Sequence, residues 1–260
     1  MRWAVVDSWT IARRDFARWA RQPGPVVVSL LFPVLIVLMF GYLFGGAMAV
    51  PGGGGYREFL MPGMFAMTML FGIETTMLAV STDAARGVTD RFRSMPMAPS
   101  AVVAGRSIAD LVNSAAGLAI MIGCGLLIGW RAHGTAGETL VAIGLLLLLR
   151  FAVLWVGIYL GLVVSGPEWV AAVQILVWPV SFLASTFVPP DTMPGWLGAV
   201  AEWNPLSPTV SALRELFGNP GAGGDSWVSR HSLLMAIVWP VVILAVFLPL
   251  SVRRYQRLGR

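Results

Sequence analysis

The sequence contains no lysine, one cysteine and two histidines. Without lysine the chain has no P-loop lysine, no Schiff-base lysine and no serine–lysine dyad, so it does not bind ATP through a P-loop. The single cysteine, Cys124, excludes an intramolecular disulfide and a thiol-rich metal site. Two histidines also make a histidine-rich metal site an unfavoured interpretation.

The residue patterns of membrane enzymes are missing as well. The sequence has no His-Glu-x-x-His string for a zinc protease and no G-x-G-x-x-G dinucleotide fingerprint. Ser165 lacks the glycine two residues upstream that rhomboid-like proteases use. His133 and His231 are expected on the outer side of the membrane, far from Ser165. We therefore expect no catalytic, cofactor-binding or metal site in this chain.

Charge is scarce and apolar residues are abundant. Asp, Glu, Lys and Arg make up 12% of the chain, where a soluble domain carries roughly 25%. Hydrophobic residues make up 57%, and the mean hydropathy is +0.77. Long apolar runs without two-residue alternation predict an all-α integral membrane protein with six spans in a transmembrane domain over residues 26–251. The expected spans are residues 26–46, 59–80, 108–130, 139–164, 169–188 and 233–251.

The arginines predict the orientation of these spans. Five lie before the first span, four between the second and third, and four in the basic tail, residues 252–260. The opposite side has four: Arg57, Arg131, Arg214 and Arg230. Because cytoplasmic segments carry the excess of basic residues, both termini are predicted to be cytoplasmic. The net charge of +5 is thus a topology signal, and no nucleic-acid partner is expected.

Two segments outside the spans have apolar patterns of their own. Residues 1–25 place Val5, Trp9 and Phe16 on one helical face and arginines on the other, which predicts an amphipathic helix at the cytoplasmic interface. The outer region 189–232 contains tryptophans and apolar residues in place of a polar loop. It predicts a re-entrant outer segment of short helices between spans five and six.

Polar residues inside the spans leave several interpretations open. Glu74 in the second span and Arg150 in the fourth form an ion pair, line a transport route, or are hydrated independently. Asp110 and Ser114 lie one turn apart near the inner end of the third span, where helix–helix hydrogen bonding is the favoured interpretation. Gln174 in the fifth span is interpreted in the same way.

An ordered set of short motifs resembles a known family. The motifs are the inner stretch DAARGVTDRFRSMPMAP at residues 83–99, GRSIAD at 105–110, SGPE at 165–168, FVP at 187–189, MPGWL at 193–197 and NP at 204–205. In this order and spacing the chain resembles the membrane subunit of ABC type-2 exporters, specifically the daunorubicin-resistance-type permeases. The resemblance spans nearly the whole chain.

The resemblance implies a six-helix subunit that is not itself an enzyme. It implies dimerisation with a second permease chain and pairing with two separate ATP-binding subunits, which would carry ATP and Mg. The N-terminal helix and the coupling loop, residues 83–107, would rest on those subunits, and Glu168 would add a second inner contact. The implied coupling surface comprises Arg14, Arg18, Asp83, Arg86, Asp90, Arg91, Phe92, Arg93, Met95 and Glu168.

The resemblance also implies alternating access, with export between two permeases along the second and fifth spans. The expected apolar lining is Met67, Phe71, Val177, Phe182 and Thr186, and the expected polar residues of the route are Glu74, Asp110, Arg150 and Gln174. The expected cargo is a lipophilic or amphiphilic drug, antibiotic or lipid, moved out across a bacterial cytoplasmic membrane. Two alternatives stay open: a polysaccharide or teichoic-acid permease of the same superfamily, and a proton-coupled carrier using Glu74.

Overall fold

The computed structural model describes residues 24–45, 50, 53–85, 99–164, 167–221 and 226–257. Within these ranges the chain is helical, and none of the described residues forms a strand. The amphipathic helix expected over 1–25 lies almost entirely outside them, as does most of the coupling loop, from residue 86 to residue 98. The all-helical prediction is therefore confirmed for the described part of the chain.

Every expected span overlaps a helix, although the fifth was expected to reach residue 188 and α7 ends at Leu183. Four helices are long and apolar enough to cross a membrane: α3 (Tyr56–Ala85), α5 (Pro99–Leu127, apolar from Ser107), α6 (Ala136–Val163) and α11 (Ser232–Arg257). The other two expected spans fall on shorter apolar helices, α2 (Gly24–Leu38) with its π-helical continuation η1 (Met39–Phe44), and α7 (Pro167–Leu183). Six crossings thus stay a prediction, as does the orientation of the termini.

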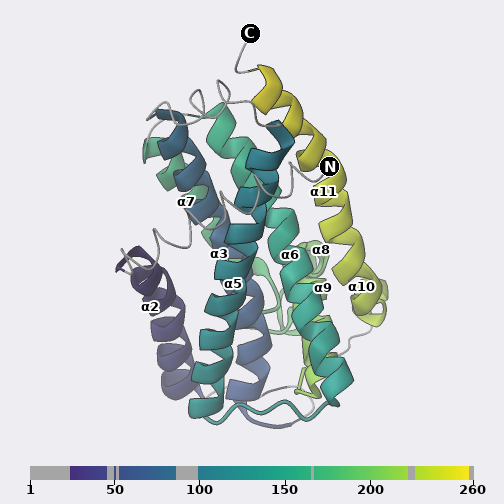
Figure 1. Ribbon diagram of the computed structural model, residues 1–260. Coiled ribbons are helices and arrows are strands. Elements are labelled where there is room, and N and C mark those ends of the chain that lie inside the picture. The colour runs from purple at the N-terminus through teal and green to yellow at the C-terminus, as the bar shows by residue number, and fades with distance from the viewer. Residues whose placement is uncertain are drawn as a thin grey trace.

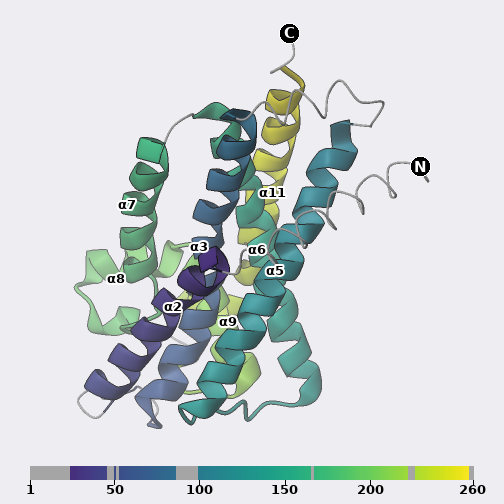
Figure 2. The ribbon, with the colours of Figure 1, turned by 60° about the vertical axis from the view of Figure 1, so that its left-hand side comes forward.

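The long helices lie roughly along one axis, with α3 and α6 at the centre (Figures 1 and 2). The contact between α3 and α6 is the most extensive between any two described helices, followed by that between α6 and α11. Gly157 and Gly161, one turn apart on α6, let α3 approach closely: a Cβ on Gly157 would lie 2.9 Å from the Ile73 carbonyl oxygen. Small residues spaced by four are a common device for close helix contact in membranes.

The outer region 189–232 folds into short helices. They are η2 (Pro190–Thr192), α8 (Gly195–Trp203), α9 (Leu206–Phe217) and α10 (Trp227–Arg230). Gly218 ends α9 in the left-handed conformation, with a φ of 63°, which glycine adopts at little cost. The short helices lie at the end of the bundle away from the C-terminus (Figure 1). Their insertion into the outer leaflet stays a prediction.

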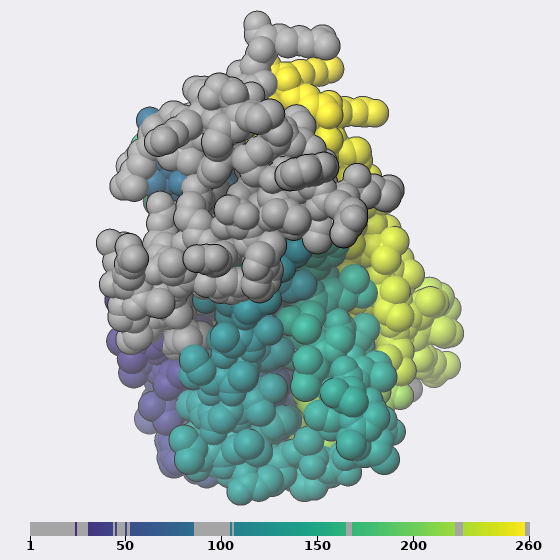
Figure 3. Space-filling model, viewed as in Figure 1, coloured from purple at the N-terminus to yellow at the C-terminus, as the bar shows by residue number. Residues whose placement is uncertain are grey.

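The outer surface of the bundle is strongly apolar. Side chains of α5, α6 and α11 form one face of the molecule (Figure 3), and α11 alone exposes Leu234, Ile237, Val241 and Val246. Continuous exposed apolar area of this kind is unfavourable in water but suits the hydrocarbon core of a bilayer. The described helices therefore have the surface of a multi-pass membrane protein.

Candidate functional site: a buried polar cluster and an aromatic surface

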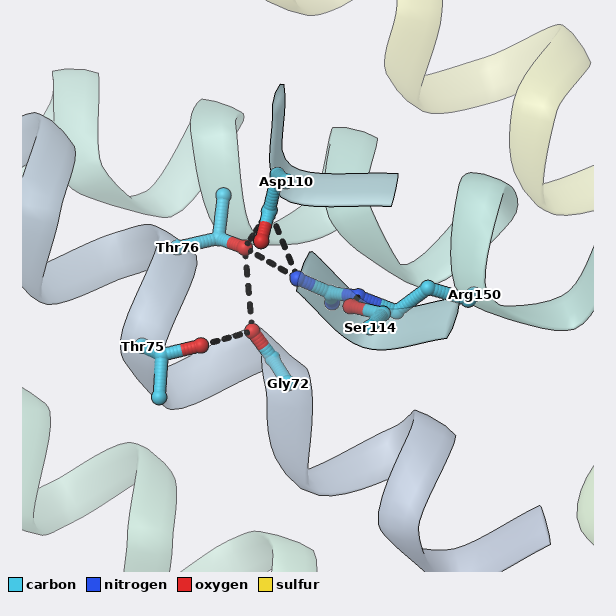
Figure 4. Close-up of polar contacts among 6 residues, drawn as sticks. All are labelled: Gly72, Thr75, Thr76, Asp110, Ser114 and Arg150. Carbon is cyan, nitrogen blue, oxygen red and sulfur yellow. Dashed lines mark hydrogen bonds and ion pairs between the residues drawn. The ribbon is translucent and has the colours of Figure 1, made fainter. Parts of the chain in front are cut away.

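Arg150 lies in the middle of α6 and is completely buried. Its Nη2 lies 2.6 Å from Asp110 Oδ2 on α5 and donates a second hydrogen bond, of 2.7 Å, to Thr76 Oγ1 on α3. Its Nε donates to Ser114 Oγ at 2.7 Å. One guanidinium therefore joins three helices, as Figure 4 shows.

Thr76 links the cluster to the backbone of its own helix. Its hydroxyl oxygen lies 2.9 Å from the Gly72 carbonyl oxygen and 2.5 Å from Asp110 Oδ2. A threonine hydroxyl has a single hydrogen to donate, so it serves one of these acceptors at a time while it accepts from Arg150. The absence of a side chain at Gly72 is required, because a Cβ there would overlap the Arg150 guanidinium.

The counter-ion of Arg150 is Asp110, so the interpretation of a Glu74–Arg150 ion pair is wrong. Glu74 has no ion-pair or hydrogen-bond partner among the described residues. The reason is helical geometry: Thr76, which faces Arg150, follows Glu74 by two residues, a rotation of about 200° around the helix. Asp110 and Ser114 do make the helix–helix hydrogen bonds that their spacing predicts.

This polar cluster has the chemistry of a structural contact. A charged side chain at mid-membrane costs about 2.5–3.5 kcal/mol on insertion scales, and pairing with an opposite charge offsets part of that cost. No cluster of histidine, cysteine, aspartate and glutamate among the described residues could hold a metal ion. The cluster therefore joins α5 to the α3–α6 pair, and α5 buries only 17% of its apolar stretch.

A second feature is a run of aromatic rings between α2, α3 and α7, here named the aromatic surface. The Trp178 ring lies 5.1 Å from the Phe32 ring, 5.1 Å from the Phe71 ring and 5.5 Å from the Phe182 ring. The Phe182 ring stacks on Phe187 at 4.8 Å. Phe32 and Phe182 are exposed, and Phe71 and Trp178 are partly exposed. Phe187 is buried and Phe71 and Trp178 pack against the core, so the exposed ring area belongs mainly to Phe32 and Phe182 and in part to Phe71 and Trp178.

The structure separates the five residues expected to form the apolar lining of a route. Phe71 and Phe182 belong to the aromatic surface, while Met67, Val177 and Thr186 are buried in the core. Thr186 packs against Gly63 of α3, where a Cβ would lie 2.6 Å from its methyl group. Of the polar residues, Gln174 is exposed and Glu74 partly exposed, whereas Arg150 and Asp110 belong to the polar cluster.

Arg214 is a buried cation. The sequence predicts only that it lies on the outer side, and assigns it no role. It lies on α9, is 1% exposed, and its Nε donates to the Phe59 carbonyl oxygen of α3 at 3.0 Å. Its Nη2 donates to the carbonyl oxygens of Ser185 and Thr186, just after α7. The guanidinium also lies 3.6 Å from the centre of the Phe59 ring. Carbonyls at a helix C-terminus carry partial negative charge, so they suit a buried cation; no pattern in the sequence signals this.

Most of the predicted coupling surface lies outside the described residues. Arg14, Arg18 and the loop residues 86–95 are among those outside the described ranges. The two described members differ: Asp83 is buried near the end of α3, and Glu168 is exposed in the first turn of α7. Both lie at the end of the bundle that carries the C-terminus (Figure 1). The coupling role of this surface stays a prediction.

A sequence model described as "ABC-2 type transporter" matches residues 7–217 of the chain. The chain belongs to the ABC-2 type transporter family. It is 34% identical to the daunorubicin resistance ABC transporter permease protein DrrB1 of Streptomyces coeruleorubidus, over 97% of this chain and 87% of the relative. This confirms the resemblance drawn from the motifs.

Two mycobacterial relatives are more distant. The chain is 28% identical to the doxorubicin resistance ABC transporter permease protein DrrB of Mycobacterium tuberculosis, over 92% of this chain and 86% of the relative. It is 22% identical to the protein of the same organism named "Probable doxorubicin resistance ABC transporter permease protein DrrC", over 96% of this chain and 89% of the relative. The polar cluster and the aromatic surface therefore belong to an ABC-2 permease with drug-resistance relatives.

Proposed function

We propose that this ABC-2 permease is the membrane subunit of an ATP-driven exporter for lipophilic or amphiphilic molecules. The observation that carries the proposal is the aromatic surface, which exposes flat rings between α2, α3 and α7 in a chain without a P-loop. Drug resistance in the names of its relatives supports a small-molecule cargo.

The energy source lies in a separate subunit. Two ATP-binding subunits, carrying ATP and Mg, dock at the end of the bundle that holds the C-terminus, with Glu168 and the 86–98 segment in their contact. A second permease chain, identical or related, completes the route across a bacterial cytoplasmic membrane. ATP binding draws the two halves from an inward-open to an outward-open form, and the cargo leaves between them by alternating access.

Co-purification from gently solubilised native membranes tests the assembly. We expect the tagged chain to bring down an ABC ATP-binding subunit in stoichiometric amount. Replacing Asp90, Arg91 and Arg93 by alanine removes charges from the coupling surface, so it should abolish that recovery. The matched control replaces Arg253 and Arg257 of the tail, and recovery should persist. Recovery of the chain alone from wild-type membranes would contradict the proposed assembly.

Transport in everted vesicles tests the energy source. A complex of this kind should accumulate an amphiphilic dye when ATP is supplied, and accumulation should persist when a protonophore collapses the proton gradient. Accumulation that follows the proton gradient without ATP would instead identify a proton-coupled carrier.

A further inference from the structure

Two polar residues lie beside the aromatic surface, each one helical turn from a central ring. Glu74 follows Phe71 by three residues on α3, and Gln174 precedes Trp178 by four residues on α7. Residues three or four positions apart share a helix face. Because α3 and α7 run in opposite directions, both steps lead toward the end of the bundle that carries the C-terminus (Figure 2). Glu74 and Gln174 thus lie one turn beyond the Phe71–Trp178 ring contact.

The carboxylate of Glu74 makes no polar contact that stabilises the described part of the fold. It has no ion-pair or hydrogen-bond partner among the described residues, and its side chain is partly exposed. Arg150, the cation that the sequence offered as a partner for Glu74, is already paired with Asp110 at 2.6 Å. An acidic side chain in a membrane span is costly without a compensating charge or hydration. A cation bound on the aromatic surface would supply that compensating charge and so favour the ionised carboxylate of Glu74.

We propose that Glu74, with Gln174 at the corresponding turn of α7, recognises the positive charge of cargo held on the aromatic surface. The preferred cargo is then a molecule that combines a flat aromatic body with one basic or quaternary nitrogen. This inference rests on the proposed export function, and it adds the residue that would select a cationic cargo over a neutral one.

The chemistry of the two neighbouring parts is complementary to such a molecule. Flat rings gain contact area and favourable stacking against Trp178, Phe71 and Phe182, and aromatic faces also attract cations. A carboxylate one turn away provides a charge-assisted contact for the nitrogen, which is strong where water is scarce. The Gln174 amide can hydrogen-bond polar substituents without adding charge. An anionic molecule of the same shape would be repelled by Glu74.

Equilibrium binding of two matched probes tests the inference. The probes are daunorubicin, which carries a protonated amine, and N-acetyldaunorubicin, which keeps the ring system without the charge. Binding is followed by probe fluorescence on the full permease–ATPase complex in lipid nanodiscs without nucleotide. Loss of both affinities in Trp178→Leu locates the binding at the aromatic surface.

The ratio of the two affinities decides the outcome. We expect the wild-type complex to favour the cation by about tenfold, the scale of one charge-assisted contact. Glu74→Gln should bring the ratio close to one, Glu74→Asp should keep part of the preference, and Gln174→Glu should increase it. The matched control Glu215→Gln, on α9 where the carboxylate accepts a hydrogen bond from Ser232 of α11, should keep the wild-type ratio. A ratio that Glu74→Gln and Gln174→Glu both leave unchanged would overturn the inference.

Transport by the same complex in sealed vesicles separates this inference from the proposed function. With ATP added to vesicles, failure of the wild-type complex to move either probe, although the cation binds preferentially, would count against export and leave the recognition site standing. ATP-driven movement of both probes with no preference for the cation would support export and overturn the proposed recognition by Glu74.

Discussion

At the scale of single residues, the polar cluster depends on one missing side chain. Gly72 admits the guanidinium of Arg150, which three hydrogen bonds hold in place and which is fully buried. Because the guanidinium cannot move aside without breaking those bonds, the glycine is a steric requirement of the site. Its neighbour Thr76 then completes the contact to Asp110.

Gly72→Ala should therefore destabilise the permease. The added methyl group overlaps the fixed guanidinium, and overpacking of this kind costs about 1–3 kcal/mol. The measurement is the unfolding temperature in detergent. Gly144→Ala on α6 is the control, because a Cβ there meets nothing within 4 Å and alanine favours a helix more than glycine does. Equal unfolding temperatures for the two variants would contradict the steric argument.

The Asp110–Arg150 pair gives a second prediction at this scale. Asp110→Leu leaves the Arg150 charge buried without its counter-ion, which should lower the free energy of unfolding by about 3–5 kcal/mol. The double variant Asp110→Leu with Arg150→Met removes both charges and should recover most of that loss. A double-mutant cycle measures the difference. Additive effects of the two single substitutions would show that the side chains are not coupled.

At the scale of elements, α9 is attached to the spans through Arg214. The guanidinium donates to carbonyl oxygens of α3 and of the segment after α7, so one side chain connects three parts of the chain. The planar fork of arginine reaches several acceptors at once, which the single ammonium of lysine does not do in the same geometry. The outer short helices are thus positioned by a side chain that has carbonyl acceptors and no carboxylate partner among the described residues.

Arg214→Lys should loosen the outer region while leaving the spans assembled. We expect limited proteolysis from the outer side to cut residues 189–232 several-fold faster, with little change in the yield of folded protein. Arg253→Lys is the control, since Arg253 is exposed near the end of α11. Unchanged cleavage in Arg214→Lys would show that packing of α9 alone, without the carbonyl contacts, holds the region.

At the scale of the whole molecule, orientation is a prediction of charge distribution that direct labelling can check. In a Cys124→Ala background, Arg131→Cys should react with an impermeant thiol reagent from outside, and Arg253→Cys only after the membrane is opened. The basis is the excess of arginine on the side of the termini. Labelling in the opposite order would place both termini outside and would remove the coupling surface from the cytoplasm.

The positions of the apolar helices were predictable because hydropathy is a local property. A run of about 20 apolar residues is read from the sequence alone, and six such runs match helices in the described part of the chain. The helix bounds were less predictable: α3 begins at Tyr56 and α5 at Pro99, before the apolar runs that predict them. Polar and small residues at helix ends are helical without being apolar.

The candidate site was only partly predictable. Sequence reasoning singled out Glu74, Arg150, Asp110 and Gln174, but it left a Glu74–Arg150 pair open. The rotation of α3 decides against that pair, since it turns Thr76 toward Arg150 and Glu74 toward the other side. Gly157 and Gly161 carried a readable signal, two glycines four residues apart, which the sequence reasoning did not use.

The sequence by itself determined that this is a helical membrane protein of the ABC-2 family without its own P-loop, because composition, hydropathy and motif order are properties of the chain alone. The tertiary structure alone decided the partner of Arg150, the burial of Arg214 and the gathering of Phe32, Phe71 and Trp178 into one surface. These depend on how each helix is rotated and which helices are neighbours. Rotation and neighbours are set by packing between residues far apart in the sequence, which no local pattern encodes.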